Sequence, residues 1–157
     1  MKTTMITKAM MAVVFAMATV FTTNAVEPTK FTNVEMDNDR VSAKVVYEKD
    51  GQYLTPEFRF EYQYGADNRV IEKKALKWNG TKWMNYYCIS VTYSETEAHM
   101  QYAIWDKKAR AFRPTEKYVY QLDEAGKFLA KYSYQLDKEN SWQLNQVILS
   151  QTMLAKR

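Results

Sequence analysis

Apolar and polar residues alternate with a period of two through most of the chain, and this pattern itself recurs every 29 residues. Four segments share it at that spacing: Phe60–Tyr64, Ile89–Tyr93, Tyr118–Leu122 and, more faintly, Val147–Gln151. Period two is the spacing at which strand side chains lie on one face of a sheet. Self-similarity at a fixed period indicates one supersecondary unit copied several times. The sequence therefore predicts a series of β-hairpins.

Nine strands are predicted, separated by short turns rich in Asn, Asp and Gly. Their approximate ranges are 31–35, 41–47, 53–64, 70–78, 83–93, 99–105, 111–122, 128–136 and 142–152. Turns of about five residues are too short for parallel crossovers, so neighbouring strands must be antiparallel. The predicted fold class is all-β, an antiparallel up-and-down meander of about eight or nine strands. Both an open coiled sheet and a barrel fit the period, and no helix is expected.

Pro56 lies inside one of the predicted strands. Proline has no amide hydrogen to donate to a neighbouring strand, so it is confined to edges and bulges. The sequence therefore predicts a bulge or an edge position at this residue.

The first 25 residues have the pattern of a secretory signal peptide. Two lysines precede an apolar segment from Ala9 to Phe21, and Thr23-Asn24-Ala25 is a small-x-small cleavage site. The apolar segment is too short to span a bilayer. We therefore expect a signal peptide over residues 1–25 and a single β-repeat domain over residues 26–157. The mature chain should have no transmembrane segment and should be periplasmic or extracellular.

Charge and composition narrow the choice of partners and of stabilising forces. The full chain carries a net charge of +4, and removal of the first 25 residues takes away two lysines. Such a weak charge gives no reason to expect nucleic acid, which usually requires a clustered basic face. The chain has 12 Tyr and 4 Trp but a single cysteine. An internal disulfide is therefore impossible, and burial must stabilise the domain.

Large aromatic residues flank the turns along one edge of the predicted sheet. In a meander every second turn lies on the same edge, so these residues should gather there. The aromatic rim consists of Trp78, Trp83, Trp105, Phe112 and Trp142. Cross-strand aromatic pairs stabilise hairpins by roughly 0.2–1 kcal/mol each. The alternative is that the rim is a stacking platform for a glycan or a peptide.

Cys88 and His99 are the only cysteine and histidine of the chain. Alternation places Cys88 on the face opposite Ile89, which predicts an outward thiol able to form an intermolecular disulfide. The alternative is a shielded, inert thiol. His99 stands at the repeat position of Val70 and Phe128, so we interpret it as a structural histidine.

No catalytic residue, metal site or cofactor is predicted, and the chain is not expected to be an enzyme. It lacks a Gly-rich phosphate loop, a nucleophile motif and a second histidine at metal-ligand spacing. Asp37-Asn38-Asp39 offers the hard oxygen ligands that calcium prefers. Ordinary turn chemistry, in which Asp and Asn side chains bind turn amides, accounts for the same residues. Acidic pairs such as Asp123 and Glu124 lie on turn tips instead of converging in a cleft.

The best-preserved unit resembles a known group of proteins. It reads Tyr-x-Tyr-x-Leu-Asp-Glu-x-Gly-Lys-Phe-Leu-x-Lys over residues 118–131, and Asp137-Lys138 and Trp142 follow. This unit is similar to small exported proteins of Bacteroides-type bacteria that form an uncharacterised domain-of-unknown-function family. It also resembles the Tyr-Asp hairpin repeats of large bacterial surface and toxin-shell proteins. The resemblance covers roughly residues 31–152 and implies a hairpin-repeat architecture without catalytic residues.

These observations favour a non-catalytic exported binding or interaction module that uses the aromatic rim or a sheet face. Its partner is unknown, and a glycan, a peptide or an envelope protein would each fit. The alternative is a self-assembling envelope structural protein, because open sheet edges can pair between chains. A small-ligand carrier or a hydrolase would instead require a deep polar cavity.

Overall fold

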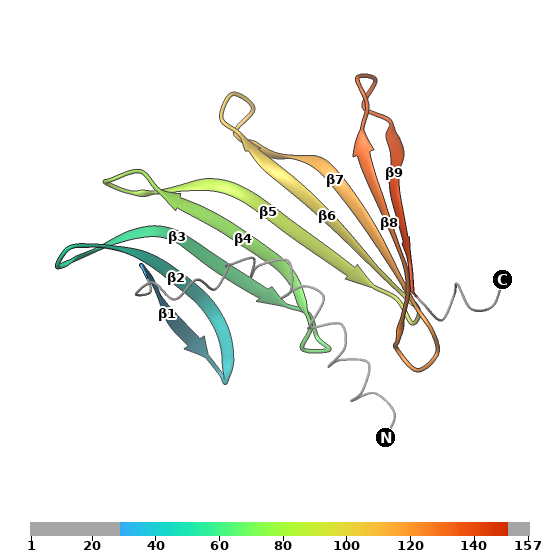
Figure 1. Cartoon of the computed structure of the whole chain (residues 1–157), viewed down its shortest axis with the longest axis horizontal. Coiled ribbons are helices and arrows are strands. Elements are labelled where there is room, and N and C mark those ends of the chain that lie inside the picture. The colour runs from blue at the N-terminus through green and yellow to red at the C-terminus, as the bar shows by residue number, and fades with distance from the viewer. Residues whose placement is uncertain (1–28, 151–157) are drawn as a thin grey trace. The chain divides into compact units, whose positions relative to one another are not determined.

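The computed structural model describes residues 29–150, and all the regular secondary structure in this range is β-strand (Figure 1). The predicted signal peptide, residues 1–25, lies outside the described residues. All nine predicted strands are present: β1 Lys30–Asp37, β2 Arg40–Asp50, β3 Tyr53–Tyr64, β4 Val70–Trp78, β5 Trp83–Tyr93, β6 Glu97–Asp106, β7 Ala111–Leu122, β8 Phe128–Leu136 and β9 Trp142–Leu149. No helix in the described range is long and apolar enough to cross a membrane.

The strands pair in the order in which they occur along the chain, from β1 to β9, in one antiparallel sheet. Because β1 and β9 stand at the two ends of this order, the sheet is open and is not closed into a barrel. The prediction of an antiparallel meander is thus confirmed, and of its two forms the structure has the open sheet. Figure 1 shows the succession of hairpins from β1 to β9.

Turns that contain residues with positive φ connect the strands. The β1–β2 turn consists of Asn38 and Asp39, with φ of 48° and 61°, between the paired residues Asp37 and Arg40. Two consecutive positive φ values are characteristic of a type I′ turn, whose twist matches that of the strands it joins. Asn68 and Gly126 occupy the repeat position of Asp39 and also have positive φ, 65° and 75°. Three copies of the repeat therefore keep a positive φ at this position although the residue type changes, whereas in the remaining copy Glu97 begins β6.

Bulges are copied with the repeat as well. The pairing register shifts at Gln63/Tyr64 and again, two repeats later, at Gln121/Leu122. A second pair of shifts, at Val46/Tyr47 and Ser133/Tyr134, lies three repeats apart. Pro56 pairs with Tyr47 directly beside one of these shifts, which confirms the predicted bulge. These bulges therefore recur with the repeat, whereas the register shift at Glu35/Met36 in the first hairpin lies one residue away from the repeat position.

The described residues form two compact units. The first unit comprises residues 29–88 and 104–112, and the second comprises residues 89–103 and 113–150. In the first unit the best-buried apolar side chains belong to Ala43, Val45, Val70 and Ala75. The core of the second unit is formed by Val91, Ala98, Met100, Tyr120 and Leu122.

A lysine lies over an aromatic ring at the same repeat position in each unit. In the first unit, Lys73 Nζ lies 4.4 Å from the ring centroid of Phe60. In the second unit, Lys131 Nζ lies 4.5 Å from the centroid of Tyr118, exactly two repeats along in both partners' sequence positions. A cation over a ring face is attracted by the ring quadrupole, by about 0.5–2 kcal/mol. This attraction offsets part of the cost of burying each ammonium on the aromatic sheet face.

Candidate ligand-binding site

The structure brings four of the five aromatic rim residues together as two separate pairs. Trp78 and Trp83 meet edge to face across the β4–β5 turn, with ring centroids 5.1 Å apart. Trp105 and Phe112 meet in the same way across the β6–β7 turn, at 5.0 Å. All four side chains are half-buried and belong to the first unit. This geometry is that of cross-strand pairs that stabilise hairpins.

Trp142, the fifth rim residue, belongs to the second unit and lines a pocket of about 240 Å³. The remaining lining residues come from three strands: Ser90 and Thr92 from β5, His99, Met100 and Gln101 from β6, and Lys117 from β7. Ser90 and Thr92 are exposed, and the indole is half-buried. The pocket thus combines one large aromatic surface with hydroxyl, amide and ammonium groups.

The polar groups of the Trp142 pocket differ in whether they already contact another protein group. Within residues 29–150, the side chains of Ser90, Thr92 and Gln101 make no hydrogen bond to another protein group. The ammonium of Lys117 lies 5.8 Å from the ring centroid of Tyr134. These three strands therefore offer donors and acceptors that a ligand can use without displacing a protein partner.

His99 is held at the edge of this pocket by a carboxylate. Its Nε2 lies 2.8 Å from Glu97 Oε2, and the Gln121 side-chain amide donates to the other oxygen of Glu97 at 3.2 Å. The hydrogen bond from His99, followed by that from Gln121, lowers the pKa of Glu97. His99 makes no hydrogen bond to Ser90 or Thr92 in the described structure. The imidazole is therefore oriented by Glu97.

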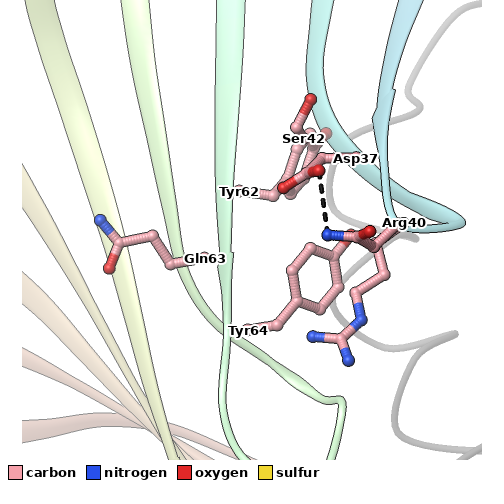
Figure 2. A pocket seen from close by; sticks show the side chains of 7 residues that line it. Asp37, Arg40, Ser42, Tyr62, Gln63 and Tyr64 are labelled. Carbon is pink, nitrogen blue, oxygen red and sulfur yellow. Dashed lines mark hydrogen bonds between the residues drawn. The ribbon is translucent and has the colours of Figure 1, made fainter.

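A second pocket, of about 390 Å³, lies in the first unit beside the β1–β2 turn (Figure 2). It is lined by Asp37, Asn38, Arg40, Ser42, Tyr62, Gln63 and Tyr64. Tyr62 and Tyr64 leave β3 on the side of β2, whereas Gln63 points to the opposite side of the strand (Figure 2). From the sequence, Asp37-Asn38-Asp39 indicates only a turn or a calcium loop, so this pocket was not predicted.

The side chains of this second pocket are fixed by specific contacts. The guanidinium of Arg40 lies 5.6 Å from the ring centroid of Tyr64. The hydroxyl of Tyr64 donates to the carbonyl of Val41 at 2.9 Å, and the Asn38 amide donates to Asp37 at 3.1 Å. Burial raises the pKa of Tyr64, and the charge of Arg40 acts in the opposite direction. The phenol is therefore neutral and is held in place beside the guanidinium.

Cys88 is half-buried on β5, whereas the repeat predicted an outward thiol. Burial, followed by the negative charge of Glu72, raises the pKa of this thiol to about 11. Only the thiolate takes part in disulfide exchange, and such a pKa leaves very little of it at neutral pH. The predicted intermolecular disulfide remains untested, but the surroundings of Cys88 make the thiol a poor nucleophile.

The Asp and Asn side chains of the turns bind turn amides. Asp123 Oδ1 accepts from the amides of Ala125 and Lys127 at 2.9 and 2.8 Å. Asp137 Oδ1 makes the equivalent pair of bonds at 2.8 and 2.9 Å, and Asn79 Oδ1 binds two amides of the β4–β5 turn. In the range that the structure describes, no three Asp, Glu, His or Cys side chains lie where they could share a metal ion. These carboxylates act as turn residues.

Part of the Trp142 pocket was readable from the sequence. Ser90 and Thr92 are two residues apart on one strand, and His99 and Gln101 are two apart on the next. Each pair therefore shares a face. A histidine at a repeat position otherwise filled by Val70 and Phe128 was a further signal. The position of Lys117 depends on pairing across bulged strands, which a single sequence does not reveal.

Comparison with known protein families shows which family the chain belongs to. A model for a family of unknown function, DUF3836, matches residues 1–122. The chain belongs to this family. No curated protein matches it.

Solved structures similar to this chain come from Bacteroides and Parabacteroides species. One is a Bacteroides fragilis NCTC 9343 protein of unknown function, with a TM-score of 0.74 and 23% identity over 79% of this chain and 94% of its own. A DUF3836 family protein from Bacteroides vulgatus ATCC 8482 has a TM-score of 0.54 and 28% identity over 55% of this chain and 91% of its own. A DUF3836 family protein from Parabacteroides distasonis ATCC 8503 has a TM-score of 0.51 and 23% identity over 81% of this chain and 95% of its own. The resemblance to an uncharacterised family of Bacteroides-type bacteria is confirmed.

Proposed function

We propose that this protein is a non-catalytic, exported binding module that holds a glycan in the Trp142 pocket. The observation that carries the proposal is the combination of a half-buried indole with uncommitted hydroxyl and amide groups in a pocket of about 240 Å³. A sugar ring has an apolar C–H face that packs on an aromatic ring, and a rim of hydroxyls that both donate and accept hydrogen bonds. The pocket offers a complement to each.

The polar lining favours a glycan over an apolar peptide side chain. Ser90, Thr92 and Gln101 would leave an apolar group facing unpaired hydroxyl and amide groups, which costs about 1–3 kcal/mol for each group that is buried without a partner. A ligand with several hydroxyls instead satisfies them.

Tryptophan fluorescence tests this proposal. The purified protein is titrated with a panel of neutral oligosaccharides, and a saturable change in emission is expected for at least one of them. Trp142→Phe keeps an aromatic ring but should remove most of the signal, and Gln101→Ala should weaken binding about tenfold, as expected for one lost hydrogen bond of roughly 1.4 kcal/mol. Trp105→Phe, in an edge-to-face pair of the first unit, is the matched control and should leave the binding curve unchanged. No change in emission with any sugar would contradict the proposal.

Export is part of the same proposal and rests on the pattern of residues 1–25. If the signal peptide is cleaved at the predicted site, the exported protein begins at Val26. Intact mass measurement of protein recovered from the periplasm or medium checks this directly. A mass that includes Met1–Ala25 would contradict it.

Self-assembly is a second candidate, favoured by the exposed apolar side chains of the two edge strands. Leu144, Val147 and Ile148 of β9 are 54%, 43% and 42% exposed, and Phe31, Val34 and Met36 of β1 are 41%, 44% and 58% exposed. Each edge strand has only one neighbour among residues 29–150. Long apolar edges promote pairing between chains. Light scattering over a hundredfold range of concentration would show a rising mass for an assembling protein, and a constant monomer mass would exclude this candidate.

A further inference from the structure

The pocket beside the β1–β2 turn contains the guanidinium of Arg40, which has no carboxylate partner among residues 29–150. The guanidinium carbon of Arg40 lies 5.6 Å from the ring centroid of Tyr64, within the range of a cation–π contact. Asp37 is the register partner of Arg40 across the turn but forms no ion pair with it. A cation–π contact uses none of the guanidinium N–H groups as hydrogen-bond donors to an oxygen, so a planar acid can bind them. Arg40 is therefore poised for a ligand.

The repeat itself explains why Arg40 is unpaired. Arg69, one repeat later, pairs with the carboxylate of Asp67. The residue that corresponds to Asp67 in the first repeat is Asn38, which is neutral. Asn38 instead donates its amide to Asp37 at 3.1 Å. Arg40 and Arg69 thus hold corresponding repeat positions in turns of different length. Arg69 is neutralised by a carboxylate, and Arg40 has no such partner among residues 29–150.

The rest of the pocket restricts the ligand. Its volume of about 390 Å³ suits a single small molecule or the end of a longer one. Asp37 lies in the same pocket, so a simple anion such as phosphate would be repelled by its carboxylate. A ligand that carries hydroxyl groups beside its acid group can donate to Asp37 while its carboxylate binds Arg40. Ser42, whose hydroxyl donates to the carbonyl of Glu35 at 3.2 Å, still has acceptor capacity on its oxygen.

We propose that this pocket binds the carboxylate of a small hydroxylated ligand, with Arg40 as the anchoring residue and Asp37 as the acceptor for its hydroxyls. A sugar acid has this chemistry. The proposal does not depend on the Trp142 pocket, which lies in the other unit and is lined by neutral hydroxyl and amide groups as well as Lys117.

The test is an NMR titration of the purified, ¹⁵N-labelled protein, with the backbone amides of residues 37–42 and 62–64 as reporters. The probes are sodium D-glucuronate, D-glucose as the counterpart without a carboxylate, and N-acetylglycine as a carboxylate without hydroxyls. Saturable shifts of these amides with glucuronate and not with glucose are expected. Equal shifts with N-acetylglycine would overturn the role of Asp37 as the acceptor for ligand hydroxyls. Equal shifts with glucose, or none with either acid, would overturn the proposal.

Two substitutions remove the anchor in different ways. Arg40→Gln deletes the guanidinium, and Asn38→Asp supplies the carboxylate that the Asp67–Arg69 pair contains. Both should weaken glucuronate binding at least about tenfold, because a charge-assisted hydrogen bond contributes roughly 1.5–3 kcal/mol. Arg69→Gln is the matched control, and Trp142→Phe checks independence from the other pocket. Unchanged binding in both Arg40→Gln and Asn38→Asp would overturn the assignment even if glucuronate binds.

Discussion

At the scale of single residues, the least expected feature is a lysine in the interior of an aromatic sheet face. Lys73 is 4% exposed, and its ammonium lies over Phe60. Burial, followed by repulsion from Lys44, lowers the pKa of Lys73 to about 8. In the unfolded chain a lysine has a pKa near 10.4. The folded protein therefore releases this proton more readily than the unfolded chain does.

Lys73→Met should consequently stabilise the protein at pH 7, on the order of 1 kcal/mol or more, because a buried charge is replaced by an apolar chain of similar length. For the wild type, the unfolded state binds more protons between about pH 8 and pH 10.4, so its stability should rise with pH across that window. The advantage of the variant should shrink accordingly. Urea denaturation of the wild type and of Lys73→Met at pH 7 and pH 10 measures the stability difference at each pH. Lys131→Met, at the less buried equivalent position, should show a smaller effect.

Thr115 gives a second residue-scale prediction. Its Oγ1 is buried and has no hydrogen-bond partner in the described structure. A buried hydroxyl without a partner loses its hydration and gains nothing in return. Thr115→Val should therefore raise the free energy of unfolding by about 1 kcal/mol, provided that the methyl group fits in place of the hydroxyl.

Thr55→Val, at an exposed position of β3, is the control for Thr115→Val and should stay within about 0.5 kcal/mol of the wild type. Thermal unfolding compares the two variants. A loss of stability in Thr115→Val would show that the hydroxyl is hydrogen-bonded in solution.

At the scale of elements, β1 is held to the sheet by an ion pair that spans β2. Arg59 on β3 donates to both carboxylate oxygens of Glu35 on β1, at 2.7 and 2.8 Å, and to Glu61 at 3.1 Å. Ala43 and Val45, the β2 residues paired with Glu35 and Arg59, are only 2% and 4% exposed. A bidentate pair of this kind fixes geometry as well as adding attraction.

The same ion pair makes the stability of β1 depend on pH. The hydrogen bond from Arg59 lowers the pKa of Glu35 below its ordinary value. The stabilisation is therefore complete above the pKa of the unfolded chain, about 4.3, and is lost as the pH falls through the lower folded pKa. Glu35→Gln should destabilise the protein at pH 7 and should have little effect at pH 2. Urea denaturation at the two pH values tests this, with Glu48→Gln, exposed on β2, as the control. An equal effect at both values would exclude the ion pair as the cause.

The sequence predicts elements better than it predicts sites, and the reason is register. Alternation and the 29-residue period are properties of each strand and each hairpin, so all nine strands follow from them, and the bulge at Pro56 follows from the missing amide hydrogen of proline. A pocket is formed by side chains of neighbouring strands, and every bulge shifts their pairing by one residue. Trp142 was predicted as a candidate, whereas its grouping with Lys117 depends on such pairing. The missing carboxylate partner of Arg40 could have been predicted without the register. Comparison of the repeats shows that Asn38 stands where the next repeat has Asp67.

At the scale of the whole molecule, the repeat determines how stability is distributed. Strands pair only with their neighbours in sequence, so each hairpin depends mainly on the adjacent hairpins, as in other repeat proteins. The second unit has its own core, in which Leu122 is 5% exposed and packs with Val91 and Met100. A substitution that weakens this core should therefore lower the local stability of the strands that form it more than that of the other strands.

Leu122→Ala tests this distribution of stability. The loss of a buried leucine typically costs about 2–5 kcal/mol. Amide hydrogen exchange should become faster in β7 and β8, where Leu122 pairs with Phe128, and much less so in β2 and β3. Val45→Ala, in the first unit, should give the reverse pattern with a smaller amplitude, because fewer methyl groups are removed. Equal acceleration in all four strands by either substitution would mean that the sheet unfolds as one cooperative unit, and that nearest-neighbour pairing does not limit how far a local defect spreads.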